Sequence, residues 1–292
     1  MVQRRDLILG LSLLAVFFVI VIIIFLVLAS VAVNGVHVSK KSVAVIEIKG
    51  PIYTPKFVVE KLERYITNEN IPAIVLRLNT PGGGVSATQE IYETVKKARL
   101  TGKKIIASMG AVAASGGYYI AAACDTVVAT PGTITGSIGV IATFPDFSEL
   151  YQKIGVNFNV RKSGKFKDTG SSSRKMTDEE EAFIDELVLD TLEQFILDVS
   201  DGRKLSIDYV RGIADGRIFT GRQALEAGLV DILGTYQDAV DLAGVLAGIG
   251  ENPPVFKETK GIFREMFIDG IMDFFSIGYE YKLPSILYMI TY

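Results

Sequence analysis

The chain has 292 residues, of which 49% are hydrophobic, and its formal net charge is −3 at pH 7. This weakly acidic balance gives no basic surface for nucleic acid, so we expect no nucleic-acid partner. The one cysteine, Cys124, excludes an internal disulfide, and its apolar surroundings indicate a buried structural thiol. The one histidine, His37, lies in a polar stretch and leaves no Ser-His-Asp triad, Cys-His pair or usual zinc ligand set. We therefore expect neither a metal nor a cofactor.

The N-terminal segment predicts a membrane anchor. From Leu7 to Val33 the sequence contains no charged residue, and this run exceeds the roughly 20 apolar residues that cross a bilayer. Arg4 and Arg5 precede it, and this positive charge favours a cytoplasmic N-terminus, with the later residues outside the cytoplasm. A cleaved signal peptide is the alternative, but its apolar core usually has about 7–15 residues. We predict a cytoplasmic end at 1–6, an uncleaved single-pass anchor in the cell membrane at 7–33 and a polar linker at 34–42.

The next part of the chain alternates between strand and helix patterns. Apolar β-branched runs that end in glycine or polar residues predict strands, and apolar residues at helical spacing predict helices. The strands are expected at 43–50, 73–79, 103–110 and 125–130, and the helices at 57–66, at 87–102 and around Ser115. Such alternation implies βαβ units and a largely parallel sheet that is covered on both faces. The sequence therefore predicts an α/β fold.

The C-terminal part of the sequence predicts a polar loop, a long helix and a strand-turn-helix unit at 214–234. Thr177 and Glu180 have the T-x-x-E spacing of a capping box, which begins the long helix. We place the domain at 43–250. The tail at 251–292 is rich in Phe, Tyr, Ile and Met, and two interpretations stay open. It is either a poorly ordered, partly amphipathic extension or a segment that binds the membrane surface or a partner.

The stretch GAVAASGGYYIAAAC, residues 110–124, contains a single serine, Ser115, among small and apolar residues. A buried serine that bonds to its own backbone is one interpretation. A nucleophile is the other, because a serine at the N-terminus of a helix lies near free N–H groups that favour developing negative charge. The Gly116 N–H is then one oxyanion donor, and Gly83 in TPGGG supplies the other from the carboxyl end of a strand. Because histidine is excluded, the base must be another residue type.

Five motifs in series resemble one family. PGGG, SMGAVAASGGYYIA, TPGTITGSIGV, KSGKFKD and ADGRIFTGRQALEAGLVD are similar, in this order, to the signal peptide peptidase A (protease IV) family of membrane-anchored serine proteases. The resemblance covers roughly residues 43–245. It implies a Clp protease/crotonase-like fold, a Ser-Lys catalytic dyad and the degradation of signal peptides that remain in the membrane after secretory proteins are processed.

The resemblance also implies the roles of five residues. The nucleophile falls on Ser115, the general base on Lys167, and the oxyanion donors on the N–H groups of Gly83 and Gly116. Ser137 matches a hydroxyl that helps to position the lysine. A lysine base must be neutral, and apolar surroundings disfavour its charged form, so a dry site is expected.

Three lysines in RKSGKFKD compete for the role of base. If this segment is extended, Lys165 and Lys167 share one face and Lys162 lies on the other. Lys165 follows a glycine in a turn-like stretch, whereas Lys167 lies between Phe166 and an aspartate, nearer to apolar surroundings. The family match independently selects Lys167.

Other functions stay open from the sequence alone. The first is a related membrane protease that cleaves membrane-associated, stomatin-like proteins. The second is a crotonase-type acyl-CoA enzyme, and the third is a non-catalytic membrane scaffold on the same fold. The expected partners of a protease are cleaved signal peptides and other peptides, with membrane lipid around the anchor. Because the chain has a single copy of the catalytic unit, we also expect a homo-oligomer.

Overall fold

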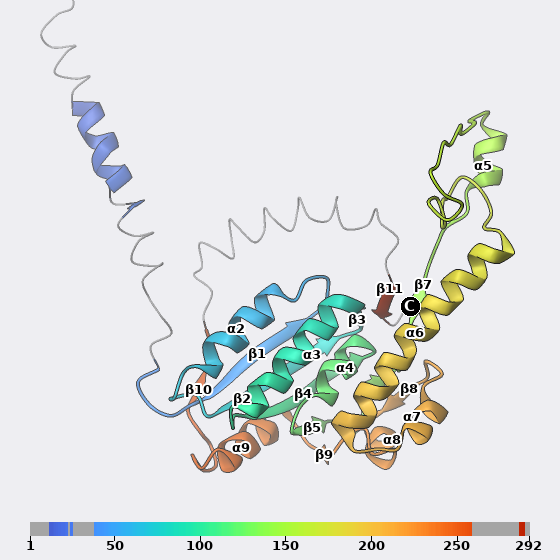
Figure 1. Ribbon diagram of the computed structural model, residues 1–292. Helices are drawn as coiled ribbons and strands as arrows, with labels where there is room; N and C mark the ends of the chain where they lie inside the picture. The colour runs from blue at the N-terminus through green and yellow to red at the C-terminus, as the bar shows by residue number, and fades with distance from the viewer. Residues whose placement is uncertain (1–11, 23, 26–37, 259–285, 290–292) are drawn as a thin grey trace, which may run out of the picture. The chain divides into compact units, whose positions relative to one another are not determined.

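The computed structural model of the chain describes residues 12–22, 24–25, 38–258 and 286–289 (Figure 1). The chain divides into two compact units, Met1–Ser39 and Lys40–Tyr292. In the first unit, residues 12–22 are helical and their side chains are exposed. Within the described ranges, no helix has both the length and the apolar character that a membrane crossing requires. The predicted anchor at 7–33 lies partly outside the described residues, and His37 lies outside them.

The second unit is built on a sheet whose main path is parallel. The strand order is β10-β1-β2-β4-β5-β9, and each neighbouring pair on this path is parallel. These strands are β1 (Val43–Lys49), β2 (Ala73–Thr80), β4 (Lys104–Ala114), β5 (Thr126–Ala129), β9 (Ile232–Leu233) and β10 (Val255–Phe256). Beside the end of β4 lies β6 (Ile134–Gly136), which is parallel to it, and β8 (Ile218–Thr220) pairs with β6 in antiparallel orientation.

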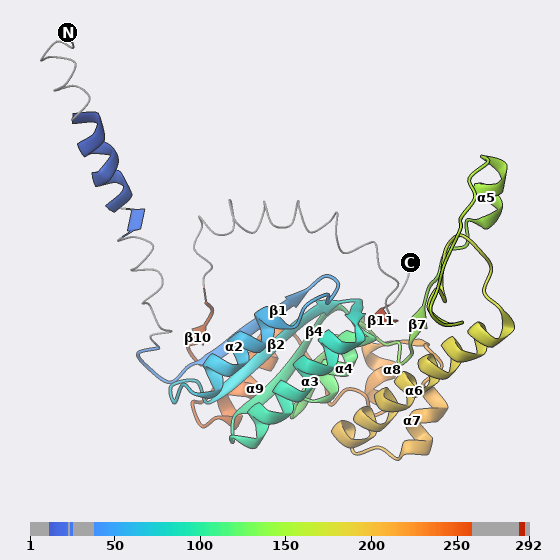
Figure 2. The ribbon, with the colours of Figure 1, turned by 45° about the horizontal axis from the view of Figure 1, so that its top comes forward.

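Helices cover both faces of this sheet, which explains why its strands are apolar almost throughout. The helices are α2 (Lys56–Ile66), α3 (Val85–Leu100), α4 (Gly116–Ala122), α5 (Ser148–Lys153), α6 (Asp178–Arg203), α7 (Ile207–Ile213), α8 (Gly221–Glu226) and α9 (Tyr236–Leu246). On one face, α9 packs Ala239, Val240 and Ala243 into a core that includes Val45 and Val128. Figure 2 shows α2, α3 and α4 side by side on the other face, where they contact β1, β2 and β4.

Most of the predicted elements are confirmed, and one boundary is wrong. The strands predicted at 43–50, 73–79 and 125–130 lie within one residue of β1, β2 and β5. Cys124 is free and buried, as predicted, and burial raises the pKa of its thiol. The third strand does not end at residue 110. It continues to Ala114, because its last residues pair with β6, so Ser115 directly follows a strand.

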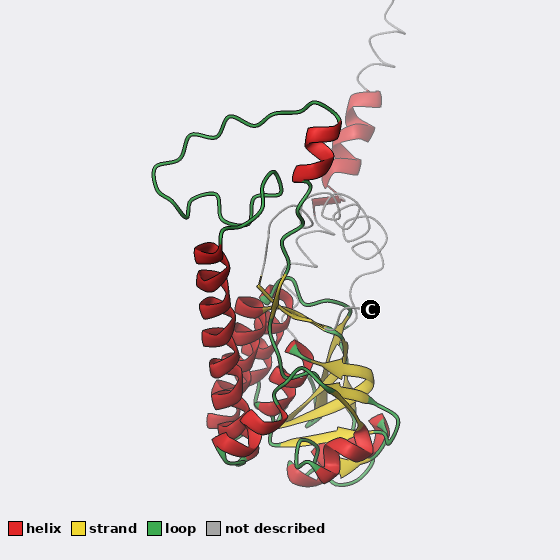
Figure 3. Ribbon diagram, turned by 90° about the vertical axis from the view of Figure 1, so that its right-hand side faces the viewer, coloured by secondary structure: helices red, strands yellow, loops and turns green. Residues whose placement is uncertain are grey.

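A long arm extends from the sheet between β7 (Ile141–Ala142) and the middle of α6. We define the arm as residues 143–190, and Figures 1 and 3 show α5 and a long loop at the far end of α6. The predicted capping box is confirmed. The Glu180 N–H donates to Thr177 Oγ1 at 3.3 Å, and the Thr177 N–H donates to Glu180 Oε2 at 3.0 Å. Several large apolar side chains of the arm are exposed, among them Phe147, Leu150, Ile154 and Phe158.

A second sheet joins three distant parts of the chain. Its order is β3-β11-β7, in which β3 is Gly82–Gly84 and β11 is Ile286–Met289. Both pairings of β11 are antiparallel. On its other side, β3 forms a parallel bridge between Gly83 and Ile52. The tail therefore contributes β10 and β11 to the fold, and the expectation of a poorly ordered extension is wrong for these residues.

Candidate active site

Ser115 lies at the junction of β4 and α4 in a conformation that serine rarely adopts. Its φ is 52° and its ψ is −117°, and a non-glycine residue in such a region costs about 1–3 kcal/mol. The Ser115 N–H donates to Gly136 O at 2.7 Å, and the Ser115 carbonyl accepts the Tyr119 N–H at 2.8 Å. These bonds fix the backbone on both sides of a sharp strand-to-helix turn, a geometry that hydrolases use to present a nucleophilic serine.

The hydroxyl of Ser115 is not used by the fold. The residue is 1% exposed, and its side chain makes no hydrogen bond to any residue in the described part of the chain. The interpretation of a buried serine bonded to its own backbone is therefore wrong.

Ser137 lies next to this turn and is strained in the same way. Its φ is 51°, and its N–H donates to Arg217 O at 2.8 Å. It directly follows Gly136, whose carbonyl accepts the Ser115 N–H. Elsewhere in the described chain, the non-glycine residues with positive φ are Lys204 and Asn252, and Lys204 is the C-cap residue that follows α6. Two strained serines at one place indicate a functional site, because strain of this kind is kept where chemistry requires it.

The glycines after Ser115 and after β2 allow α4 to pack closely against the end of β2. Gly116 is the first residue of α4, where N–H groups lack a partner within the helix. A Cβ atom on Gly117 would lie 2.7 Å from Thr80 Cγ2, so only glycine lets α4 approach the end of β2 this closely. Strand β3 contacts α4, which places Gly83 beside the helix that begins after Ser115.

Gly83 is fixed by Ile52 as well as by its place in β3. The Ile52 N–H donates to Gly82 O, and the Gly84 N–H donates to Ile52 O, each at 2.8 Å. A Cβ atom on Gly83 would lie 2.1 Å from Ile52 O. The structure therefore brings together the turn at Ser115, Ser137 and the strand of Gly83.

Lys167 does not lie with these residues. Its side chain is exposed on the arm, and Figure 3 shows the loop between α5 and α6 clear of the strands. The segment is not extended, because the Lys167 N–H donates to Gly164 O at 3.2 Å and the Thr169 N–H donates to Phe166 O at 3.2 Å, as in successive turns. The prediction that Lys165 and Lys167 share a strand face is therefore wrong. The dry surroundings expected for Lys167 are likewise not found around it.

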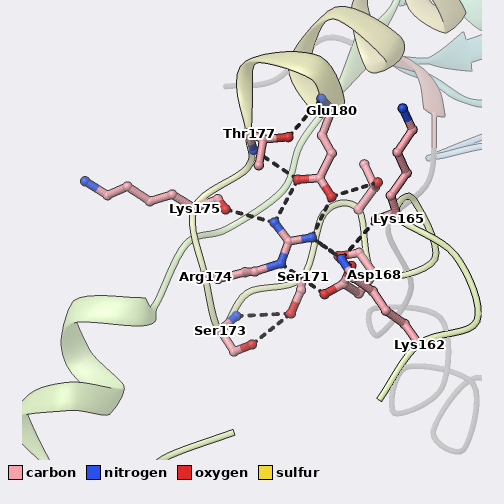
Figure 4. A network of polar contacts seen from close by, with 10 residues as sticks. Lys162, Lys165, Asp168, Ser171, Ser173, Arg174, Lys175, Thr177 and Glu180 are labelled. Carbon is pink, nitrogen blue, oxygen red and sulfur yellow. Dashed lines mark hydrogen bonds and ion pairs between the residues drawn. The ribbon is translucent and has the colours of Figure 1, made fainter. Parts of the chain in front are cut away.

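The arm contains an ion-pair network that sequence reasoning missed (Figure 4). Arg174 lies at its centre, where Nε donates to Asp168 Oδ2 at 3.0 Å and Nη1 donates to Glu180 Oε2 at 2.7 Å. Lys162 Nζ donates to Asp168 Oδ1 at 2.6 Å. Hydrogen bonds from Arg174 hold the pKa of Glu180 at about 2 and lower the pKa of Asp168 well below its usual range. Both carboxylates are thus ionised at neutral pH, and they fix the turn that contains Lys167.

Comparison with known families decides what kind of site this is. A model of peptidase family S49 matches residues 97–250, and a Clp protease model matches residues 43–134. This chain belongs to peptidase family S49. The two matches together span the predicted domain from β1 to the end of α9, and they confirm both the family resemblance and a Clp protease-like domain. Membership makes the chain a serine protease, and it counts against an acyl-CoA enzyme and against a non-catalytic scaffold.

Three relatives of this S49 chain carry protease names. It is 45% identical over 214 residues to the Synechocystis protein slr0021, which is assigned as a protease. This alignment covers 72% of this chain and 76% of the relative. It is 38% identical over 189 residues to a protein of Enterococcus faecium assigned as signal peptide peptidase SppA, which covers 65% of this chain and 55% of that protein. It is 35% identical over 176 residues to protease 4 of Haemophilus influenzae, which covers 60% of this chain but 28% of the relative. The chain thus spans little more than half of the second protein and about a quarter of the third.

Proposed function

We propose that this S49 protease is a membrane-anchored endopeptidase that uses Ser115 as nucleophile and Lys167 as general base to degrade remnant signal peptides. The single observation that carries the proposal is the turn at Ser115. The backbone of Ser115 is strained at the start of α4, and its hydroxyl has no hydrogen-bond partner among the described residues.

The chemistry follows from the groups around this turn. Ser115 Oγ attacks the carbonyl carbon of the scissile bond while a neutral lysine accepts its proton. The N–H groups of Gly83 and Gly116 stabilise the oxyanion, and each such donor is worth about 10²–10³ in kcat. Ser137, which follows Gly136 in the chain, orients the amine of the lysine. The ester then reacts with water, and Ser115 is regenerated.

In this mechanism a neighbouring copy of the chain supplies the lysine. Lys167 is exposed on an arm that lies apart from Ser115 in one copy. The arm also exposes large apolar side chains, for example Ile154 at 62% and Leu150 at 53%, and such surfaces commonly mark protein interfaces. Packing of one arm against the next copy would cover these side chains and bring Lys167 to a dry site. A homo-oligomer with shared active sites is the consequence.

The substrate and location rest on the sequence. The uncharged run at 7–33 is long enough for a single anchor, and Arg4 and Arg5 orient the catalytic domain outside the cytoplasm. A protease held at the membrane surface is well placed to take hydrophobic peptides that leave the bilayer. The Enterococcus faecium relative assigned as signal peptide peptidase SppA supports the same substrate class. A protease of membrane-associated, stomatin-like proteins is the second candidate, which the same anchor supports.

Mass spectrometry of peptide products tests the proposal. Purified full-length chain is incubated with a signal peptide, and Ser115→Ala is the matched control because it removes the attacking oxygen and almost no volume. We expect cleavage by the wild type. Ser115→Ala should keep less than about a thousandth of the wild-type kcat, which is near the residual activity that oxyanion binding alone provides. Greater activity in the mutant would exclude Ser115 as nucleophile. Cleavage of a stomatin-like segment in preference to signal peptides would favour the second candidate.

A mixing experiment tests the shared site. Ser115→Ala and Lys167→Met are each expected to be inactive, and they are mixed under conditions in which subunits exchange. A site then combines an intact serine with a neighbour's intact lysine in about one case in four, so about a quarter of wild-type activity should return. No recovery after demonstrated exchange would place the base in the same copy as the serine.

A further inference from the structure

Helix α6 carries the arm, and its buried side chains lie mostly near its C-terminal end. One buried residue of α6, Glu180, belongs to the ion-pair network of the arm. The others are Thr191, Phe195, Ile196 and Val199. Helix α6 contacts α4 and α7, and Figure 2 shows it beside α4. The direction of the arm therefore depends on how residues 191–203 pack against these two helices.

Tyr119 connects this part of α6 to the turn at Ser115. Its N–H donates to Ser115 O at 2.8 Å, so its backbone belongs to the turn. Its side chain is buried, and the centroid of its ring lies 4.6 Å from that of Phe195 and 4.9 Å from that of Tyr92. Its hydroxyl donates to Asp198 Oδ2. One side chain on α4 thus contacts α3 through a ring, and α6 through a ring and a carboxylate.

Asp198 receives hydrogen bonds from two tyrosines. Tyr119 donates to its side chain, and the Tyr92 hydroxyl donates to its backbone carbonyl at 3.1 Å. Burial raises the pKa of the Asp198 carboxyl, because a charged group is disfavoured away from water. A hydrogen bond to a carboxylate is strong and restricts the geometry of donor and acceptor, whereas apolar contact is non-directional. The Tyr119 hydroxyl therefore fixes an angle between α4 and α6 that ring packing alone leaves adjustable.

A change at this contact is amplified along α6. The helix begins at Asp178, and a rise of about 1.5 Å per residue places that end about 30 Å from Asp198. A tilt of about 5° at Asp198 then displaces the start of α6 by about 3 Å. A misplacement of about 1 Å can lower a rate about 10²-fold. Lys167 lies on the arm beyond this end, so the position of its amine depends on how α6 is seated.

We propose that Tyr119 and Asp198 are positioning residues, whose hydrogen bond sets the direction of the arm and thereby the place where Lys167 meets the serine. This inference rests on the proposed function, because it takes Lys167 as the base. The ring of Tyr119 is covered by side chains of α3 and α6. It acts on the reaction through the arm and not through the peptide.

Kinetics of single variants test the hydrogen bond. Tyr119→Phe keeps the ring and removes the hydroxyl, and kcat for a signal peptide should fall about 10- to 100-fold while KM stays within about twofold. Asp198→Asn keeps an acceptor oxygen for Tyr119 and should keep kcat within about threefold of the wild type. Asp198→Leu removes the acceptor and should match Tyr119→Phe. Combining Tyr119→Phe with Asp198→Leu should lower kcat no further, because both changes remove one interaction.

Tyr118→Phe is the matched control. Tyr118 is the adjacent residue and is equally buried, but its hydroxyl donates to Leu229 O at 3.1 Å. Its loss also removes a buried hydrogen bond of α4, and kcat should stay within about threefold of the wild type. An equal fall of kcat in Tyr118→Phe would make the effect one of general packing and overturn the proposal. Wild-type kcat in Tyr119→Phe, or additive losses in the double variant, would also overturn it.

Mixed oligomers separate an effect on the arm from an effect on the Ser115 turn. Ser115→Ala copies can supply only the lysine and Lys167→Met copies only the serine, so Tyr119→Phe is added to one kind of copy at a time. Activity should fall about 10- to 100-fold when the change is in the Ser115→Ala copy, and it should stay within about threefold when the change is in the Lys167→Met copy. The opposite pattern, or equal loss from both, would overturn the proposal.

Failure of the proposed function gives a different result. If the mixture without Tyr119→Phe regains no activity after demonstrated exchange, the shared site is contradicted, and the single variants alone then decide the role of Tyr119. A Ser115→Ala chain that still hydrolyses the signal peptide would contradict the nucleophile, whatever the effect of Tyr119→Phe.

Discussion

Replacing Gly83 by alanine places a methyl group where the backbone of residue 52 already lies. The added carbon would be 2.1 Å from Ile52 O and 2.5 Å from Ile52 N. Non-bonded atoms settle about 3.5 Å apart, so β3 and Ile52 must separate by more than about 1 Å. This movement breaks the two 2.8 Å hydrogen bonds between them, which contribute about 0.5–1.5 kcal/mol each. With overpacking at about 1–3 kcal/mol, we expect Gly83→Ala to lose about 2–6 kcal/mol of stability.

Catalysis should suffer as well. If the Gly83 N–H is the oxyanion donor that we propose, a shift of about 1 Å moves it out of line with the oxyanion, and the loss of one such donor costs about 10²–10³ in kcat. Because an oxyanion donor acts mainly in the transition state, kcat should fall more than KM rises.

Gly84→Ala is the matched control for this experiment. Its added carbon would be 3.7 Å from Ile52 O, an ordinary contact, and Gly84 has φ −62° and ψ 134°, which alanine adopts freely. Thermal unfolding and hydrolysis of a fluorogenic peptide are measured on both variants. We expect Gly84→Ala to stay within about threefold of wild-type kcat, since a side chain is tolerated there. Wild-type kcat and Tm in Gly83→Ala would refute the reasoning, and a pure KM effect would make TPGGG a binding strand only.

Four further predictions follow from the same structure. Ser115→Gly should be more stable than Ser115→Ala by about 1 kcal/mol, because glycine adopts the positive φ without strain. Calorimetry of the two variants checks this, and a less stable glycine variant would contradict it. Lys167→Met should abolish peptide hydrolysis while Lys165→Met keeps most of it, and the reverse pattern would move the base to Lys165. The Tm difference between wild type and Arg174→Gln should be constant from about pH 5 to 8 and shrink at lower pH. The pKa of Glu180 is lowered from 4.5 to about 2, so the stabilisation from its ion pair with Arg174 is lost only as pH falls through that interval. A difference that shrinks near neutral pH would contradict this. If the run at 7–33 anchors the chain as proposed, protease added to intact spheroplasts should digest the catalytic domain, and full protection until lysis would contradict the proposed orientation.

The sequence predicted the strands and helices whose apolar side chains are buried in the core around the sheet. β1, β2 and β5 are apolar runs that are covered on both sides, and α2 has an apolar stripe that ends where the helix ends. The end of β4 could not be predicted in the same way. Its residues 111–114 are small and apolar, which suits a helix as well as a strand, and they are held as a strand by pairing with β6, which lies about 20 residues further along the chain.

The arm was predicted poorly because its structure depends on charges rather than on hydrophobic periodicity. The capping box at Thr177 was visible as a local motif. The partnership of Arg174 with Asp168 and Glu180 was not, because each carboxylate lies six residues away in sequence and turns bring them together. The assumption of an extended segment failed for the same reason.

The tail shows the limit of local patterns most clearly. The residues of β11 could form a strand in many places, and nothing local indicates that its partners are Gly82–Gly84 and Ile141–Ala142. The groups that hold Ser115 rest on the sheet, where strand pairing and packing fix them. The proposed base, Lys167, lies instead on the exposed arm. If Ser115 and Lys167 act as proposed, the strained serine rests on a rigid support and its base lies on an exposed arm, so the site is complete only when a neighbouring copy supplies the lysine.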